Sequence, residues 1–217
     1  MRLACIGYRD WSLNIYSKIK EEFPRYDFLI QTSKDTYSEE QIVKFNPDLV
    51  FFYGWSDIIA ADLIEKYKCL MLHPSPLPKY RGGSPIQNQI IRGEIDSAVT
   101  IFLMDNGIDT GPIARQDYLS LEGSLNDIFS RIETIGYELT KDILLNGLAL
   151  KAQDHTNATS FTRLYPKMSE ITIEELTLQS SLYLSNKIRM LQDPYPNAFL
   201  KTSDGKKLVF KLVGVED

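Results

Sequence analysis

The sequence predicts an α/β fold: a three-layer domain with a mostly parallel sheet between two layers of helices. Short apolar runs alternate with helical segments along most of the chain, and 47–53 is a continuous run of the kind buried on both faces of a parallel sheet. A second run, 69–72, leads directly into His73 and a proline-rich polar loop. Because ligands of such sheets bind beyond the carboxyl ends of strands, this layout predicts the active site at His73.

The individual elements follow from local patterns. Asn146-Gly147 is a normal helix stop, and Ser38 to Gln41 forms a capping box. Ser84-Pro85 is a typical helix start, with serine at the N-cap and proline in the first turn. We expect strands at 2–8, 26–31, 47–53, 69–72, 98–103 and 112–118. We expect five helices in this part of the chain: one that ends near Glu22, two that start at Ser38 and Ser84, and two that span 60–68 and 125–146.

The organisation changes after the predicted long helix. Residues 1–150 carry the strand–helix alternation and are expected to form the catalytic domain, and 151–175 is a polar connecting segment. Residues 176–217 are expected to form an appendage, with one helix over 176–191 and a β-hairpin centred on Asp204-Gly205.

Composition excludes several classes of protein. The 217 residues carry a net charge of −5, which argues against a broad nucleic-acid surface. No apolar run approaches the ~18 residues of a membrane span. The two cysteines, Cys5 and Cys69, lie in predicted buried strands without metal-ligand spacing. We therefore expect a reduced, cytoplasmic protein that binds neither nucleic acid nor membrane.

Two motifs carry the functional information. His73-Pro-Ser-Pro-Leu-Pro-Lys-Tyr-Arg-Gly82 resembles the H-x-S-x-L-P-x-x-R-G signature of the folate-dependent formyltransferases, and Met104-Asp-Asn-Gly-Ile-Asp-Thr-Gly111 resembles their second motif. In character the chain is most similar to the sugar-nucleotide N-formyltransferases. The resemblance implies a Rossmann-like formyltransferase domain, N10-formyltetrahydrofolate as co-substrate and no metal. It implies that His73 and Asp109 are catalytic, and it places Met71 where the family has an asparagine.

The resemblance also implies binding residues. The formyl donor is expected near Tyr53, Gly54, Trp55, Ile58, Leu103, Met104, Asp105 and Gly107, and the substrate near Arg9, Ser75, Lys79, Tyr80 and Arg81. Structural alternatives remain open. Arg9 is equally interpreted as part of a surface turn, Trp55 as a core residue, and Arg81 as a residue that pairs internally to hold its loop.

The chemistry of formyl transfer assigns roles to the two catalytic candidates. An amine attacks the formyl carbon and a tetrahedral oxyanion forms. His73 is expected to offer an N–H to that oxyanion, and Asp109 to orient the imidazole and favour its charged form. As alternatives, His73 is a strand-end residue bonded to backbone, and Asp109 is a turn-former. Met71 leaves one expected oxyanion donor missing.

The acceptor expected from the sequence is a nucleotide-linked amino-deoxysugar, such as a dTDP-4-amino-4,6-dideoxyhexose. Its product would serve surface polysaccharide synthesis, including O-antigen or lipopolysaccharide. Lys79 and Arg81 suit a pyrophosphate. After 193–199, which resembles the join to a tRNA-binding barrel, only one hairpin follows. A homodimer through the C-terminal region is expected. The alternatives are transfer to glycinamide ribonucleotide or another amine, and a non-catalytic folate- or nucleotide-binding relative, because of Met71.

Overall fold

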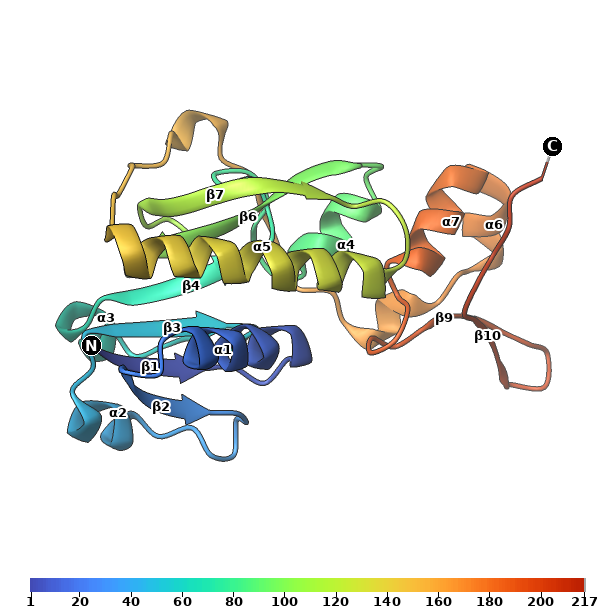
Figure 1. The fold of residues 1–217 in the computed structure, drawn as a ribbon. Coiled ribbons are helices and arrows are strands. Elements are labelled where there is room, and N and C mark those ends of the chain that lie inside the picture. Colours follow the sequence, from blue (N-terminus) through green and yellow to red (C-terminus); the bar gives the residue numbers. More distant parts are fainter. Residues whose placement is uncertain (217) are drawn as a thin grey trace.

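The computed structural model describes residues 1–216 and is built around a six-stranded, mostly parallel sheet (Figure 1). Its strands are β1 (Arg2–Ile6), β2 (Asp27–Gln31), β3 (Leu49–Tyr53), β4 (Cys69–His73), β6 (Asp96–Leu103) and β7 (Ile113–Ser120). They lie in the order β2-β1-β3-β4-β6-β7. The first four are mutually parallel, and β6 is antiparallel to both β4 and β7. The predicted α/β sheet is confirmed.

Helices cover both faces of this sheet (Figure 1). One face carries α1 (Asp10–Glu22) and α5 (Leu125–Asn146), and the other carries α2 (Glu39–Phe45) and α3 (Ala61–Lys66). Along β4, Leu70 and Leu72 join the core under α1 and α5, whereas Met71 packs against the core under α2 and α3. Side chains alternate along a strand, so Met71 and His73 point to the same side.

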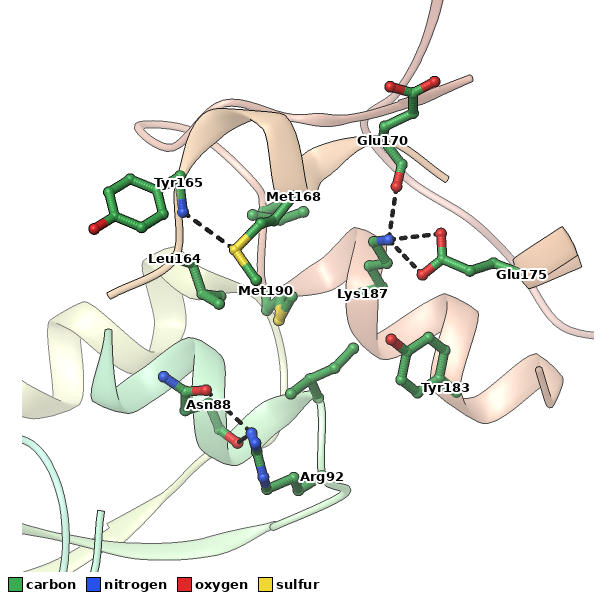
Figure 2. A pocket seen from close by; sticks show the side chains of 12 residues that line it. Asn88, Arg92, Leu164, Tyr165, Met168, Glu170, Glu175, Tyr183, Lys187 and Met190 are labelled. Atoms are coloured by element: carbon green, nitrogen blue, oxygen red, sulfur yellow. Dashed lines mark hydrogen bonds and ion pairs between the residues drawn. The ribbon is translucent and has the colours of Figure 1, made fainter. Parts of the chain in front are cut away.

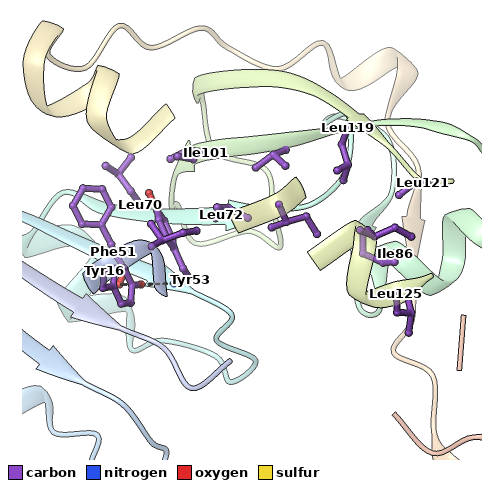
Figure 3. Close-up of a cluster of buried hydrophobic side chains, with 14 of the residues drawn as sticks. Tyr16, Phe51, Tyr53, Leu70, Leu72, Ile86, Ile101, Leu119, Leu121 and Leu125 are labelled. Atoms are coloured by element: carbon purple, nitrogen blue, oxygen red, sulfur yellow. Dashed lines mark hydrogen bonds between the residues drawn. The ribbon is translucent and has the colours of Figure 1, made fainter. Parts of the chain in front are cut away.

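The larger core lies between the sheet, α1, α5 and the short helix α4 (Pro85–Ile90) (Figure 3). A buried tyrosine organises its centre. The Tyr16 hydroxyl lies 2.9 Å from the carbonyl oxygen of Ile6 and accepts the N–H of Tyr53 at 2.9 Å. Tyr16 therefore links the carboxyl ends of β1 and β3. The strand order reverses between these two strands, and ligands of open α/β sheets bind beside such a point.

The connecting segment packs back onto the first 150 residues. It contains η1 (His155–Asn157), β8 (Ser160–Phe161) and η2 (Pro166–Ser169). The strand β8 pairs in parallel with β5 (Arg81–Gly82), inside the loop that follows His73. Residues far apart in the sequence are thereby held together beside the predicted site.

The single helix predicted over 176–191 is wrong. Two helices occupy this region, α6 (Ile173–Leu178) and α7 (Ser181–Arg189). Gln179 is extended between them, and Ser180 begins the second helix by accepting the N–H of Tyr183 through its side chain. The predicted hairpin is confirmed as β9 (Ala198–Lys201) paired with β10 (Lys207–Phe210).

The C-terminal region shares the larger core. Ile188, Met190, Leu191 and Ala198 belong to the same buried cluster as the sheet residues under α1 and α5. α7 and β9 therefore contribute to the main hydrophobic core. Within residues 1–216, no helix combines the length and apolar character needed to cross a bilayer.

Candidate active site

His73 ends β4 and is buried, with 5% of its surface exposed. Its Nε2 atom lies 2.8 Å from the carbonyl oxygen of Tyr80. Because a carbonyl oxygen only accepts hydrogen bonds, Nε2 carries a proton and donates it. The second ring nitrogen, Nδ1, faces the Asp109 carboxylate, 3.5 Å from Oδ2. The nitrogen left for chemistry is therefore Nδ1.

Asp109 reaches the histidine from the loop between β6 and β7. Its φ is 53°, a left-handed conformation that typically costs a non-glycine residue ~1–2 kcal/mol. The Asp105 side chain supports this loop by accepting the Gly107 N–H and the Thr110 hydroxyl. A Cβ on Gly111 would lie 1.8 Å from the carbonyl oxygen of Leu103, so only glycine permits the return of the chain to β7. These local constraints direct Asp109 toward His73.

The Asp109 carboxylate is buried and accepts one backbone hydrogen bond. Oδ2 accepts the backbone N–H of Gly82 at 2.7 Å, and only 9% of the residue is exposed. With Nε2 of His73 already donating, the carboxylate and Nδ1 attract each other only when Nδ1 is also protonated. The geometry thus places the carboxylate where it would stabilise a doubly protonated ring.

The loop after His73 is held from several sides. Its backbone carbonyls accept side-chain hydrogen bonds from β6, β7 and α4: Thr100 to Ser75, Gln116 to Leu77, and Gln89 to Pro74. Helix α4 starts at Pro85 as predicted, but Ser84 does not cap it. Ser84 has φ 49°, and its hydroxyl accepts the Leu164 N–H instead. The loop is a rigid support for His73.

Three of the predicted substrate residues are turned inward. Ser75 is fully buried and donates its hydroxyl to the carbonyl of Lys79. Tyr80 stacks on Phe161, and burial together with a hydrogen bond to Glu94 raises its pKa to about 12. Arg81 is 6% exposed and bonds Gln153. All three side chains are engaged in contacts within the protein, and their binding of substrate stays a prediction.

Lys79 and Arg9 remain as outward-facing cations. Lys79 is exposed on the loop after His73. Arg9 precedes α1 and is half-buried, with its guanidinium carbon 5.1 Å from the ring centre of Tyr8 and 5.6 Å from that of Tyr195. The neighbouring Ser12 hydroxyl donates to the carbonyl of Arg9. Arg9 is thus held at the carboxyl end of β1 in a defined position.

The loop after β3 contributes an apolar wall with one unused donor. Trp55 packs against the smaller core beside Tyr8 and Tyr37, and its indole Nε1 is buried without a partner among residues 1–216. Met71 and Met104 are partly buried against the same core, on the face of the sheet that carries His73. Trp55, Met71 and Met104 thus form a partly buried apolar wall on the face of the sheet that carries His73.

The other residues expected near the formyl donor differ in position. The Tyr53 side chain is fully buried in the larger core with its hydroxyl bonded to Thr140, and a role for Tyr53 near the formyl donor stays a prediction. Gly54 has φ 63° and touches Arg9, where a side chain would clash. Ile58 is 96% exposed, and Leu103 is partly buried against the larger core. Asp105 and Gly107 lie at the exposed tip of the Asp109 loop.

Sequence reasoning missed two functional contacts. The backbone N–H of Gly82 binds the Asp109 carboxylate, and the side chain of Gln153 links Arg81 to the Asp109 loop. A backbone donor leaves no signal in side-chain patterns. Gln153 stands alone in a polar stretch, and no local motif distinguishes it.

A cavity of about 500 Å³ lies apart from these groups, between α4, η2 and the C-terminal helices (Figure 2). None of the predicted site residues lines it. Inside it, Lys187 donates to both carboxylate oxygens of Glu175 and to the carbonyl of Glu170. The Lys187–Glu175 ion pair is thus satisfied within the cavity, and the rest of the lining mixes apolar side chains with polar ones such as Asn88 and Arg92.

The comparison with known families agrees with the geometry. A family model described as formyl transferase matches residues 17–140, which include His73, Gly82 and Asp109. The chain belongs to the formyl transferase family. The match begins within α1 and ends within α5, and so covers the part of the sheet that carries the site.

Several individual relatives extend this result. A methionyl-tRNA formyltransferase of a Nitratiruptor species is 31% identical over 68% of this chain and 50% of its own length. The solved structure of a methionyl-tRNA formyltransferase from Clostridium thermocellum is 30% identical, with a TM-score of 0.86 over 96% of both chains. A sugar N-formyltransferase from Shewanella sp. shares the fold at 16% identity, with a TM-score of 0.76 over 100% of this chain and 99% of its own. This chain spans about half the length of the curated Nitratiruptor relative.

Proposed function

We propose that this protein is an N-formyltransferase that moves a formyl group from N10-formyltetrahydrofolate to an amine. The observation that carries the proposal is the arrangement of His73, Asp109 and the Gly82 N–H. One nitrogen of the buried His73 imidazole donates to a backbone carbonyl. The other nitrogen faces the buried Asp109 carboxylate, which accepts the Gly82 N–H. The co-substrate would supply the formyl group, and Trp55, Met71 and Met104 would form the apolar side of its site.

The two side chains have complementary roles. Nδ1–H of the His73 imidazolium donates to the oxygen of the formyl group as negative charge develops there. The Asp109 carboxylate first stabilises the charged imidazole. As the bond between the attacking nitrogen and the formyl carbon forms, the carboxylate then accepts a proton from that nitrogen, directly or through a water. His73 then passes its proton toward the leaving nitrogen, and Asp109 restores it. The pair handles one proton throughout, so the site returns to its starting state.

Met71 reduces the supply of oxyanion donors. Loss of one such donor typically lowers the rate by ~10²–10³-fold. Kinetics can separate three outcomes: transfer is slow, a backbone N–H replaces the missing donor, or catalysis is lost completely. We favour activity because both proton-handling residues are present and lie together.

The proposed acceptor is the amine of a nucleotide-linked amino-deoxysugar. Lys79 lies on the loop that follows His73, and Arg9 lies at the carboxyl end of β1, where a phosphorylated ligand is favoured at the start of α1. The likeness in fold to a sugar N-formyltransferase extends over the whole chain and is consistent with this acceptor. In that case the product would serve surface polysaccharide synthesis.

The rival acceptor is the aminoacyl group of a tRNA, because several relatives are named for that activity. Incubation of the protein with N10-formyltetrahydrofolate and three sets of amines would separate the alternatives: amino-sugar nucleotides, methionyl-tRNA and glycinamide ribonucleotide. We expect turnover with an amino-sugar nucleotide. Turnover with methionyl-tRNA or glycinamide ribonucleotide alone would overturn the acceptor. Folate binding by calorimetry without any formylated product would overturn the enzyme itself.

A homodimer through the C-terminal region is also proposed. Leu208 and Val209 on β10 and Leu212 after it are exposed, at 53%, 48% and 82%. Apolar side chains gathered at one end of a molecule favour association. Light scattering should show a dimer, and Leu212→Glu should shift it toward monomer. A monomer at all concentrations would contradict this proposal.

A further inference from the structure

Gln153 connects the two loops that form the site. It lies in the connecting segment, beyond residues 17–140 that match the family, and is 6% exposed. Its Oε1 accepts from the Arg81 guanidinium, at 3.2 Å from Nε and 2.6 Å from Nη2. Its Nε2 donates to the carbonyl oxygens of Asp109 at 2.9 Å and Gly111 at 2.7 Å. One side-chain amide thus holds both loops.

The Asp109 loop requires such a tether. Asp109 has a left-handed φ, and its neighbour Ile108 is 70% exposed. The only hydrogen bond to the Asp109 carboxylate among residues 1–216 comes from Gly82. Gly82 follows Arg81 directly, so the residue that orients the carboxylate is adjacent to the one that Gln153 anchors. Gln153 therefore restrains the backbone of Asp109 and the donor to its side chain together.

We propose that Gln153 is a positioning residue that keeps the Asp109 carboxylate aligned with Nδ1 of His73, and so sets the rate of transfer. The effect on rate rests on the proposed function, whereas the effect on the His73–Asp109 geometry does not. Only an amide side chain can make these contacts at position 153. Its oxygen must accept hydrogen bonds from the Arg81 guanidinium, and its nitrogen must donate to two backbone carbonyls. A carboxylate would repel both carbonyls. Among residues 1–216, a leucine would leave the buried Arg81 guanidinium with only Nδ1 of His155, 3.1 Å from Nη2, as an acceptor.

Two substitutions and one control test this proposal. Gln153→Leu removes every contact, and Gln153→Glu keeps the size and the acceptor for Arg81 while removing the two donors. The control is Gln31→Leu. Gln31 is also buried, with 3% of its surface exposed. Its side-chain amide holds a loop through both ends, because Nε2 donates to the carbonyl of Ser38 and Oε1 accepts the N–H of the same residue. It lies on β2, at the opposite end of the strand order from the Asp109 loop.

Two measurements separate positioning from general stability. The chain has two histidines, so the NMR ring signals that vanish in a His73→Gln variant are those of His73, and no substrate is needed. His155 is kept in every variant because its Nδ1 lies 3.1 Å from Nη2 of Arg81. Steady-state kinetics with the formyl donor gives kcat and KM separately. An Asp109→Asn variant supplies the reference spectrum for a histidine that has lost its carboxylate. Thermal unfolding of each variant measures the loss of stability that all buried glutamine substitutions share.

Both Gln153 variants should move the His73 ring signals toward those of Asp109→Asn. Their kcat should fall by ~10- to 100-fold with little change in KM, as misplacement of a reacting group by about 1 Å can produce. Gln31→Leu should lower the melting temperature and leave the His73 signals and kcat unchanged. Unaltered His73 signals in Gln153→Glu would overturn the proposal, even if transfer to amino sugars were never detected. A shifted spectrum with unchanged kcat would overturn the effect on rate.

Discussion

Two buried nitrogen-bearing side chains, Lys187 and His73, each face a carboxylate, and the two pairs are built differently. In the C-terminal region, the Lys187 ammonium lies 2.7 and 2.9 Å from the Glu175 carboxylate oxygens and 2.7 Å from the Glu170 carbonyl, so all three donors are used (Figure 2). In the candidate active site, Nδ1 of His73 and Oδ2 of Asp109 are 3.5 Å apart. The Asp109 carboxylate has one backbone donor.

The difference shows how hydrogen bonding separates a structural pair from a reactive one. A fully satisfied ion pair stabilises one arrangement and has no spare donor for a ligand. The His73–Asp109 pair leaves Nδ1 and part of a carboxylate available, and a rigid loop holds them. Such an arrangement costs stability, and catalysis is the usual reason to retain it. Each prediction below acts on one of the two pairs or on a residue beside it.

The largest effect is expected from His73→Ala. Removal of the imidazole eliminates the donor to the developing oxyanion and the proton relay, so kcat/KM should fall by ~10³-fold or more. The fold should survive, because the main structural loss is one hydrogen bond to the Tyr80 carbonyl, worth about 1 kcal/mol. Circular dichroism would verify the fold. Near-normal turnover in this variant would remove His73 from the mechanism.

Lys187→Met acts on the structural pair and should lower stability without slowing transfer. The substitution leaves the half-buried Glu175 carboxylate without its cation, at a cost of about 2–4 kcal/mol. Denaturation in urea measures this loss. The matched control is Lys201→Met, because its pair with Glu170 is mostly exposed and should contribute about 0–1 kcal/mol. Equal losses in the two variants would contradict the structural role of Lys187.

Asp109→Asn should preserve the loop and remove the charge. The amide oxygen can still accept the Gly82 N–H, but it neither takes a proton nor stabilises the imidazolium. We expect kcat to fall by ~10²-fold and the pH dependence of kcat to change. The matched control is Asp105→Asn in the same loop, which should have a smaller effect. A pH–rate profile identical to wild type would argue against Asp109 as the proton-handling group.

Met71→Asn should produce a smaller change in rate. Met71 shares the His73 side of β4 and packs partly against the smaller core. If the oxyanion lacks a donor, the new amide should raise kcat. If a backbone N–H already fills that role, the rate should stay flat while the melting temperature falls, since an unsatisfied amide costs about 1–3 kcal/mol. Inactivity of both forms with folate still bound would support the non-catalytic alternative.

The smallest effect concerns acid stability. Burial by itself raises the pKa of Glu175, but hydrogen bonds from Lys187 and the Thr172 N–H outweigh it and hold this pKa below its usual value. In this pH range the folded state binds fewer protons than the unfolded state. The contribution of Glu175 to folding stability is therefore complete above pH ~4.5, the pKa of a glutamate in the unfolded chain, and declines as the pH falls through the lowered pKa of the folded state. Glu175→Gln should flatten the decline of melting temperature in this range. An unchanged slope would contradict the contribution of this carboxylate.

Much of the architecture was determined by the sequence itself. Period-two and continuous apolar runs give the strands, and Asn146-Gly147 marks the end of α5, because these signals act between neighbouring residues. The helix over 176–191 was predicted incorrectly for the same reason: its apolar pattern continues across Gln179, although the chain turns there and Ser180 caps a second helix.

The features of the site also separate into those that local patterns indicate and those that depend on long-range contacts. The two motifs pointed to His73 and Asp109 through their resemblance to formyltransferase signatures, and the structure brings the two side chains together. Only the tertiary structure decided that Ser75, Tyr80 and Arg81 turn inward, that Nδ1 is the free nitrogen, and that Gln153 joins the two loops. These features depend on contacts between residues far apart in the chain, such as 44 positions between Gln153 and Asp109, and burial there is set by packing that no local pattern encodes.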